Sequence, residues 1–153
     1  MTLVSVAFTT LSTLLADPGA DFAASAETLA SIVSERAAIA RTYPAQAAPH
    51  LSADDALATG LISLAGQAMT LSLRMEEANG PEDLRCIYRG MAQDASHHLD
   101  RLSQAELRAD RLAVYADIEY LLEHAQEIGP LADQDEIAPF TGVPPDCPRG
   151  PLP

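Results

Sequence analysis

Apolar residues recur along most of the chain at intervals of three and four positions, which is the spacing of amphipathic helices. The first such row follows a predicted break at 17–19 and consists of Phe22, Ala26, Leu29, Val33 and Ala40, with Ile32 and Ile39 beside it. Asp21 or Ser25 is the predicted N-cap of this helix, because either side chain can accept a bond from a free backbone N–H. The helix is predicted to end before Pro44, since the residue before a proline is pushed out of the α region.

The next helix is predicted to begin at Ser52, with Asp55 completing a shortened capping box, and to end at 79–80. Its main apolar row consists of Leu57, Leu61, Leu64, Ala68, Leu71 and Met75. Ile62, Met69 and Leu73 lie about 130° round from that row at 100° per residue, on a second apolar face. A helix that is apolar on two sides is central in its domain or shared with a partner chain, so we expect a homodimer.

The uncharged part of this helix, 56–73, has a length near that of a membrane span. It falls short of the roughly 20 apolar residues that a span needs and contains several Ser, Thr and Gln residues. Membrane helices are commonly flanked by Lys or Arg residues, and no such cluster flanks this segment. A helix buried in protein on more than one side is therefore the preferred interpretation, and no membrane contact is expected.

The region 82–128 is predicted to form two helices, 82–102 and 104–128. The step from Leu102 to Leu107 breaks the helical phase, and the segment from Ser103 to Glu106 has the form of a capping box. A single bent helix is the alternative. The apolar rows are Leu84, Ile87, Tyr88, Met91, Ala95, His98 and Leu102, then Leu107, Val114, Ile118, Leu121, Ala125 and Ile128.

The two ends of the chain differ from the middle. The segment 1–15 is apolar like part of a signal peptide, but the first basic residue is Arg36, so we interpret it as mature, helical sequence. The last 25 residues hold seven of the eleven prolines and predict an extended arm. The arm is a solvated tail or a docking peptide with Phe140, Val143 and Leu152 as anchors.

These patterns together predict an all-α fold. It is a bundle of four main helices, over 1–128, with an N-terminal apolar segment packed on it and the Pro-rich arm following over 129–153. The length of 153 residues suits one domain with its own core.

The net charge is −13, and all nine basic residues are arginine, which indicates a high-GC bacterial genome. Such acidity argues against direct contact with a nucleic-acid backbone. Cys86 and Cys147 fit no metal or redox spacing. Because the chain is long enough to form a core without a disulfide or metal cross-link, we expect two unlinked thiols in a reducing cytoplasm.

The best candidates for chemistry lie on the last two helices. Asp94, His97 and His98 share one turn, and His124 follows on the next helix. A ferritin-like di-iron bundle requires a Glu from each of two helices and an ExxH motif from each of two others. Only 94–97 approximates one such motif, so a carboxylate/His site for a divalent metal, with a redox or metal-handling role, is the alternative function. His98 is expected to be a hydrogen-bonded core residue, and no cofactor and no catalytic residue is predicted.

The favoured function is a non-catalytic interaction or regulatory protein. Twelve acidic residues and five arginines lie between 76 and 128, so a basic protein partner would be attracted to these helices. The predicted partner-binding residues are Glu119, Glu123, Glu127, Phe140 and Val143.

Overall fold

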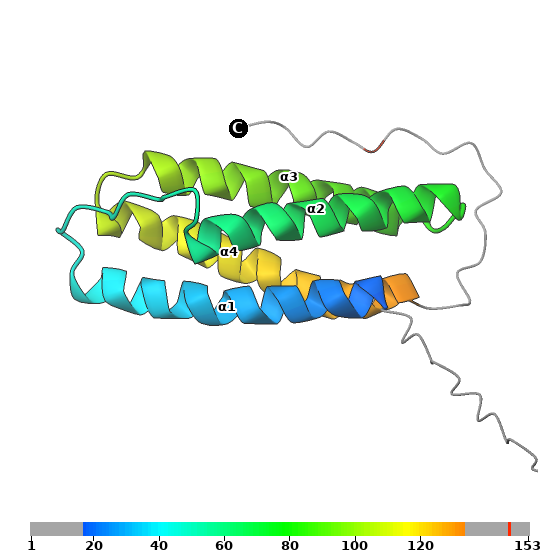
Figure 1. The fold of residues 1–153 in the computed structure, drawn as a ribbon, viewed down its shortest axis with the longest axis horizontal. Coiled ribbons are helices and arrows are strands. Elements are labelled where there is room, and N and C mark those ends of the chain that lie inside the picture. The colour runs from blue at the N-terminus through cyan, green and yellow to red at the C-terminus, as the bar shows by residue number, and fades with distance from the viewer. Residues whose placement is uncertain (1–16, 134–146, 148–153) are drawn as a thin grey trace, which may run out of the picture.

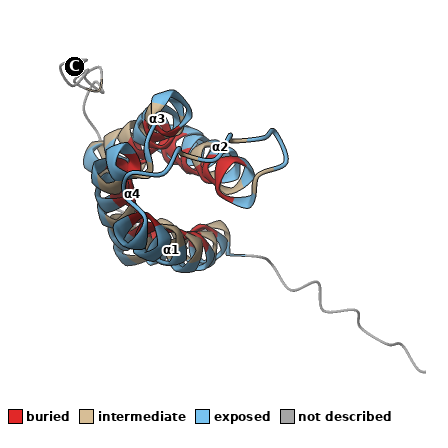
Figure 2. Ribbon diagram, turned by 90° about the vertical axis from the view of Figure 1, so that its left-hand side faces the viewer, coloured by how far each residue is buried: buried red, intermediate tan, exposed pale blue. Residues whose placement is uncertain are grey.

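A computed structural model describes residues 17–133 and residue 147, and it confirms an all-α bundle of four helices. The helices are α1 (Pro18–Thr42), α2 (Ala56–Glu77), α3 (Glu82–Gln104) and α4 (Arg108–Ile128), followed by a short 3₁₀ turn, η1 (Gly129–Asp133). They alternate in direction along the bundle (Figure 1) and follow one another around its axis as α1, α4, α3 and α2 (Figure 2). The predicted N-terminal segment and most of the arm lie outside the described residues.

The core is formed by the predicted apolar rows. The rows of α1 and α2 are buried along their whole length, as are Tyr88 to Leu102 on α3 and Val114 to Ala125 on α4 at helical spacing. Phe22 and Tyr88 meet edge to face, with ring centroids 5.9 Å apart. The Tyr88 hydroxyl donates to the Ile128 carbonyl at 2.7 Å. Burial, reinforced by the charge of Asp133, raises the pKa of Tyr88 to about 12, so this hydroxyl stays a donor. Ile87, in the predicted α3 row, is exposed.

The start of α1 differs from the prediction. Of the predicted break at 17–19, Asp17 is extended and precedes the helix, whereas Pro18 and Gly19 belong to its first turn, where the missing N–H of proline costs nothing. The cap comes from η1, at the other end of the described chain. The Asp133 carboxylate accepts from the backbone N–H groups of Gly19 at 2.9 Å and Ala20 at 2.8 Å. This contact requires a close approach, since a Cβ on Gly19 would lie 2.1 Å from the Gly129 carbonyl oxygen.

Two further helix starts are shifted from their predicted positions. The N-cap of α2 is Asp55 rather than Ser52, and its carboxylate accepts from the N–H groups of Leu57 and Ala58. Two separate helices follow α2, as expected. The second begins after Leu107, whose N–H donates to the Asp110 carboxylate at 2.9 Å, and not at the predicted 103–106 capping box.

The two loops at one end of the bundle are joined by backbone hydrogen bonds. The N–H groups of Arg108 and Ala109 donate to the carbonyls of Gln46 and Pro44, at 2.9 and 3.0 Å. Ala48 N–H donates to the Glu106 carbonyl at 2.8 Å. The long α1–α2 loop is thereby fixed against the beginning of α4.

Candidate functional site

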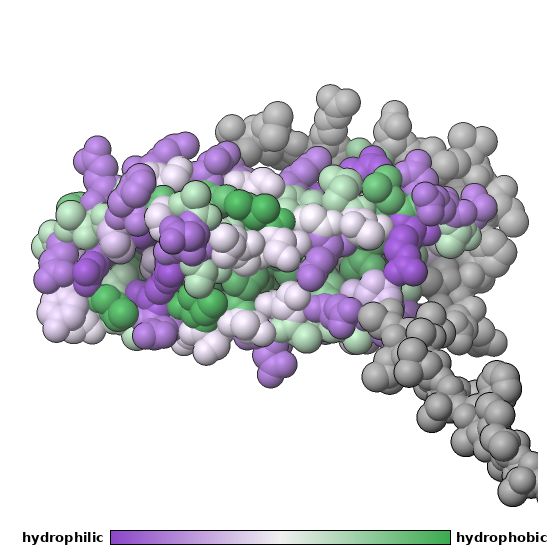
Figure 3. All heavy atoms as spheres, viewed as in Figure 1, coloured by the Kyte–Doolittle hydropathy of each residue, from purple (hydrophilic) through white to green (hydrophobic). Residues whose placement is uncertain are grey.

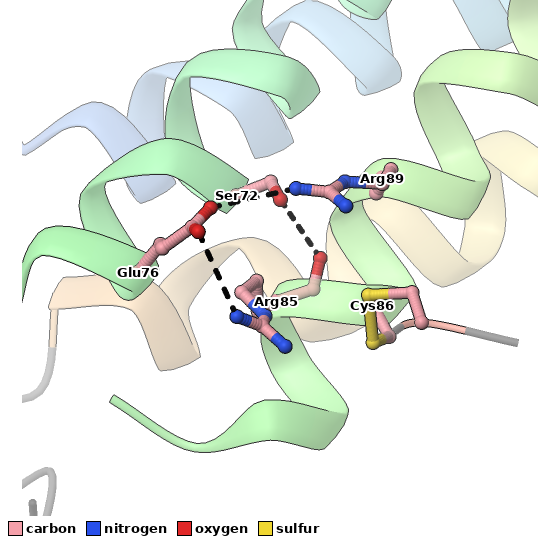
Figure 4. Close-up of a disulfide and its surroundings, with 6 residues drawn as sticks. Ser72, Glu76, Arg85, Cys86 and Arg89 are labelled. Atoms are coloured by element: carbon pink, nitrogen blue, oxygen red, sulfur yellow. Dashed lines mark hydrogen bonds and ion pairs between the residues drawn. A yellow bond between two sulfur atoms is a disulfide. The ribbon is translucent and has the colours of Figure 1, made fainter. Parts of the chain in front are cut away.

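A disulfide joins Cys86, in the first turns of α3, to Cys147 in the C-terminal arm (Figure 4). The expectation of two unlinked thiols is therefore wrong. The spacing of the cysteines gave no sign of the bond, because 61 positions separate them and the pairing is a tertiary contact. An even cysteine count in a short chain was the only available signal.

The helix turns beside the disulfide are held to α2 by polar contacts. The Ser72 hydroxyl donates to the Arg85 carbonyl at 3.0 Å, and both residues are buried. Glu76 pairs with Arg85 at 3.9 Å and with Arg89 at 3.5 Å. The α3 end of the disulfide is thus fixed to the bundle.

A groove of about 520 Å³ runs between α3 and α4. Its lining residues are Ile87, Gly90, Met91, Asp94 and His98 from α3, with Asp117, Tyr120, Leu121 and His124 from α4. No arginine lines it. Tyr120 is 63% exposed, and its ring centroid lies 4.2 Å from that of His124. The groove therefore combines exposed apolar and aromatic surface with carboxylates.

Three of the four predicted metal-site residues, Asp94, His98 and His124, line this groove, whereas His97 is exposed outside it. Within residues 17–133 and residue 147, no group of three or more His, Cys, Asp and Glu side chains is arranged to hold a metal ion. The structure therefore brings these residues near one another without forming a coordination sphere.

His98 is the buried polar residue of the groove. It is 9% exposed, and its Nδ1 has no hydrogen-bond partner among the described residues. Burial is the largest influence on its pKa, followed by opposing effects of Asp117 and Arg101, and the pKa is lowered from its usual value. The imidazole is consequently neutral at pH 7.

The predicted partner-binding acids lie along α4 outside the groove lining. Glu123 and Glu127 are exposed as expected, whereas Glu119 is half-buried. The acids that do line the groove are Asp94 and Asp117, and Asp117 forms an ion pair with Arg101. Phe140 and Val143 lie outside the described residues.

A second pocket, of about 250 Å³, lies at the end of the bundle where the two loops are joined. Its lining residues are Arg36, Ile39 and Ala40 from α1, Pro49 and Asp55 from the loop, and Arg108, Arg111 and Tyr115 from α4. Sequence reasoning missed this pocket, because its arginines come from helices far apart in the chain and share no local motif.

The second apolar face of α2 is exposed. Ile62 is 60% and Leu73 49% exposed, and Met69 also faces outward. The expectation that this helix is buried on more than one side does not hold within the described residues. Figure 3 shows the side of the molecule on which α2 lies in front, with green and white surface along much of its length. In the described part of the chain, α2 is also the one helix whose length and composition would suffice to cross a membrane.

Comparisons with known proteins returned no match: no family model, no curated protein and no solved structure is similar to this chain.

Proposed function

We propose that the protein is a non-catalytic binding protein whose α3–α4 groove receives a basic, partly apolar segment of a partner protein. The observation that carries this proposal is the lining of the groove. Asp94 supplies negative charge there, Asp117 adds a carboxylate that is paired with Arg101 outside the lining, and Tyr120 and Ile87 leave apolar surface exposed.

The two features have different roles in binding. Carboxylates attract a basic segment over about 8–10 Å at ordinary ionic strength, which speeds association and orients the partner. Exposed Glu123 and Glu127 on the same helix extend that field. The affinity comes mainly from anchors such as Tyr120, because aromatic side chains that become buried dominate binding energies.

Covalent catalysis by a cysteine has no support in this structure. The Cys86 sulfur is bonded to Cys147 and so offers no thiolate, which is the nucleophilic form. The disulfide also removes the basis for expecting a reducing cytoplasm, since persistent disulfides occur in oxidising compartments. We therefore propose that the protein works in an oxidising compartment.

Self-association is the second part of the proposal, with the uncharged face of α2 as the contact. The chain carries a net charge of −13, so most faces of two copies repel each other. The face with Ile62, Met69 and Leu73 carries no charge between 56 and 73, and two copies can meet there without repulsion. A two-fold dimer would place this face against itself.

The groove is tested by parallel affinity capture with matched variants. Asp94→Asn removes one charge from the groove, and Glu35→Gln removes one from the exposed surface of α1. Tyr120→Ala removes the aromatic anchor, with His97→Ala as its control. We expect a partner protein to be retained by wild type, Glu35→Gln and His97→Ala. Its retention by Asp94→Asn and Tyr120→Ala should be at least about tenfold lower. The proposal fails if every protein retained by wild type is retained equally by the groove variants, or if retention does not weaken with salt.

A further inference from the structure

The 250 Å³ pocket concentrates positive charge in an acidic protein. Three of the chain's nine arginines, Arg36, Arg108 and Arg111, line it. The single lining carboxylate is Asp55, which is already paired with Arg36 at 3.0 Å and caps α2. Burial acts to raise the pKa of Asp55, but the hydrogen bonds from Arg36 and from the α2 backbone outweigh it, and the pKa is lowered. Asp55 therefore stays ionised and neutralises one of the three guanidinium groups.

The other two arginines have no carboxylate partner among the described residues. Arg111 is 3% exposed, its Nη2 donates to the Pro49 carbonyl at 2.7 Å, and its Nε has no hydrogen-bond partner. The Nε of Arg108 is likewise buried without a partner, and its guanidinium lies 5.8 Å from the centroid of the Tyr43 ring. A buried charge without a counter-ion is costly, so the buried guanidinium of Arg111, together with the half-buried one of Arg108, favours the binding of an anion.

We propose that this pocket binds a small organic carboxylate, whose carboxylate group is held by Arg108 and Arg111. Guanidinium groups match the planar, two-oxygen geometry of a carboxylate. The remaining walls, from Ile39, Ala40, Pro49 and Tyr115, are suited to an apolar body attached to that group. A volume of about 250 Å³ is below the range of drug-sized ligands and limits the ligand to a small metabolite.

The frame of the pocket is built before any ligand arrives. The backbone bonds from Ala48, Arg108 and Ala109 fix the loop that supplies Pro49 against the beginning of α4. Asp55 fixes the other end of that loop to α1 through Arg36. Binding in such a frame requires little ordering of the protein. This site lies apart from the α3–α4 groove and does not depend on the function proposed for that groove.

Isothermal titration calorimetry on the full, oxidised chain tests the proposal with benzoate as the probe. Benzamide, its neutral analogue, tests the need for charge, and inorganic phosphate tests the alternative oxyanion. We expect saturable binding of one benzoate per chain, no binding of benzamide, and weaker binding of phosphate than of benzoate. Added chloride should weaken the binding of benzoate by competing for the guanidinium groups.

Matched variants assign the binding to this pocket. Arg108→Gln removes a half-buried guanidinium and should weaken benzoate binding by at least about tenfold, the effect of one lost charge-assisted hydrogen bond. Arg41→Gln removes an exposed arginine near the same end of α1 and should leave the affinity unchanged. Circular dichroism must show that Arg108→Gln is folded. If this variant does not fold, Arg108→Lys, which keeps the charge, is used in its place. Absence of saturable benzoate binding, tighter binding of phosphate, or equal losses in Arg108→Gln and Arg41→Gln would each overturn the proposal.

Discussion

Replacing Gly19 by alanine should push η1 away from the beginning of α1. The new Cβ would lie 2.1 Å from the Gly129 carbonyl oxygen and 2.7 Å from an Asp133 carboxylate oxygen. A flexible side chain could turn away, but a backbone oxygen at the end of α4 can move only if η1 shifts from α1. That shift would also lengthen the bonds by which Asp133 caps the first N–H groups of α1.

The size of the effect follows from opposing contributions. Alanine stabilises a helix interior by up to about 1 kcal/mol relative to glycine. Forcing an extra methyl group into a packed contact costs about 1–3 kcal/mol, and loss of a helix cap costs about 1 kcal/mol more. We expect Gly19→Ala to lower the free energy of unfolding by about 1–3 kcal/mol in total. The thermal midpoint should then fall by roughly 3–10 °C for a chain of this size.

Gly90→Ala is the matched control. This glycine also lies in a helix, but a Cβ there meets nothing within 4 Å, so the same substitution should be neutral or stabilising. Urea unfolding followed by far-UV circular dichroism gives the free energy for both variants, and Asp133→Ala isolates the contribution of the cap. If Gly19→Ala proves as stable as Gly90→Ala, the close contact between α1 and η1 does not exist in solution.

Three further outcomes follow from the structure. Cys86→Ser, or reduction, should lower the free energy of unfolding by up to about 4 kcal/mol, which is the chain-entropy value for so long a closed loop. Equal urea midpoints with and without reductant would contradict the disulfide. The pKa of His98 is lowered by burial, so below the unfolded-state pKa of about 6.5 the unfolded chain takes up the proton first. In urea titrations, the free energy of unfolding of wild type should therefore fall between pH 7 and 5. It should fall less for His98→Gln and as much as in wild type for His97→Gln. Identical losses in all three proteins would refute burial as the cause. In multi-angle light scattering wild type should run as a dimer and the double variant Ile62→Asp/Leu73→Asp as a monomer, whereas a monomeric wild type would exclude self-pairing of the α2 face.

The four helices could be predicted because the periodicity of apolar residues is a local signal. The row from Leu57 to Met75 on α2 and the row of α1 are buried as that spacing required. Ile87 shows what this periodicity cannot predict, which is whether another element covers a given apolar position. It shares the helical phase of buried neighbours, yet it lies at the open edge between α3 and α4, where no further element of the described chain covers it.

Apart from the shifted starts of α2 and α4, the features that sequence reasoning missed depend on tertiary contacts. The cap of α1 comes from Asp133, 113 or 114 positions away from the N–H groups that it accepts from. The pairing of Cys86 with Cys147 joins residues 61 positions apart. The pocket of Arg36, Arg108 and Arg111 exists because two loops are joined by backbone bonds. Of the candidate chemistry, the neighbourhood of Asp94, His98 and His124 was predictable from their positions on adjacent helices, but their arrangement was not.

The contact between Gly19 and Gly129 also has a consequence for the order in which the helices can be connected. It brings the first and last described elements together at one end of the bundle (Figure 1). A short linker could therefore join 133 to 18, and new termini could be opened in the exposed turn at 78–80 between α2 and α3. Such circular permutants are tolerated where termini lie close together and the opened turn is exposed. The packing of the four helices, rather than their sequence order, would then specify this architecture, and the described unit would be suited to insertion into a loop of another domain.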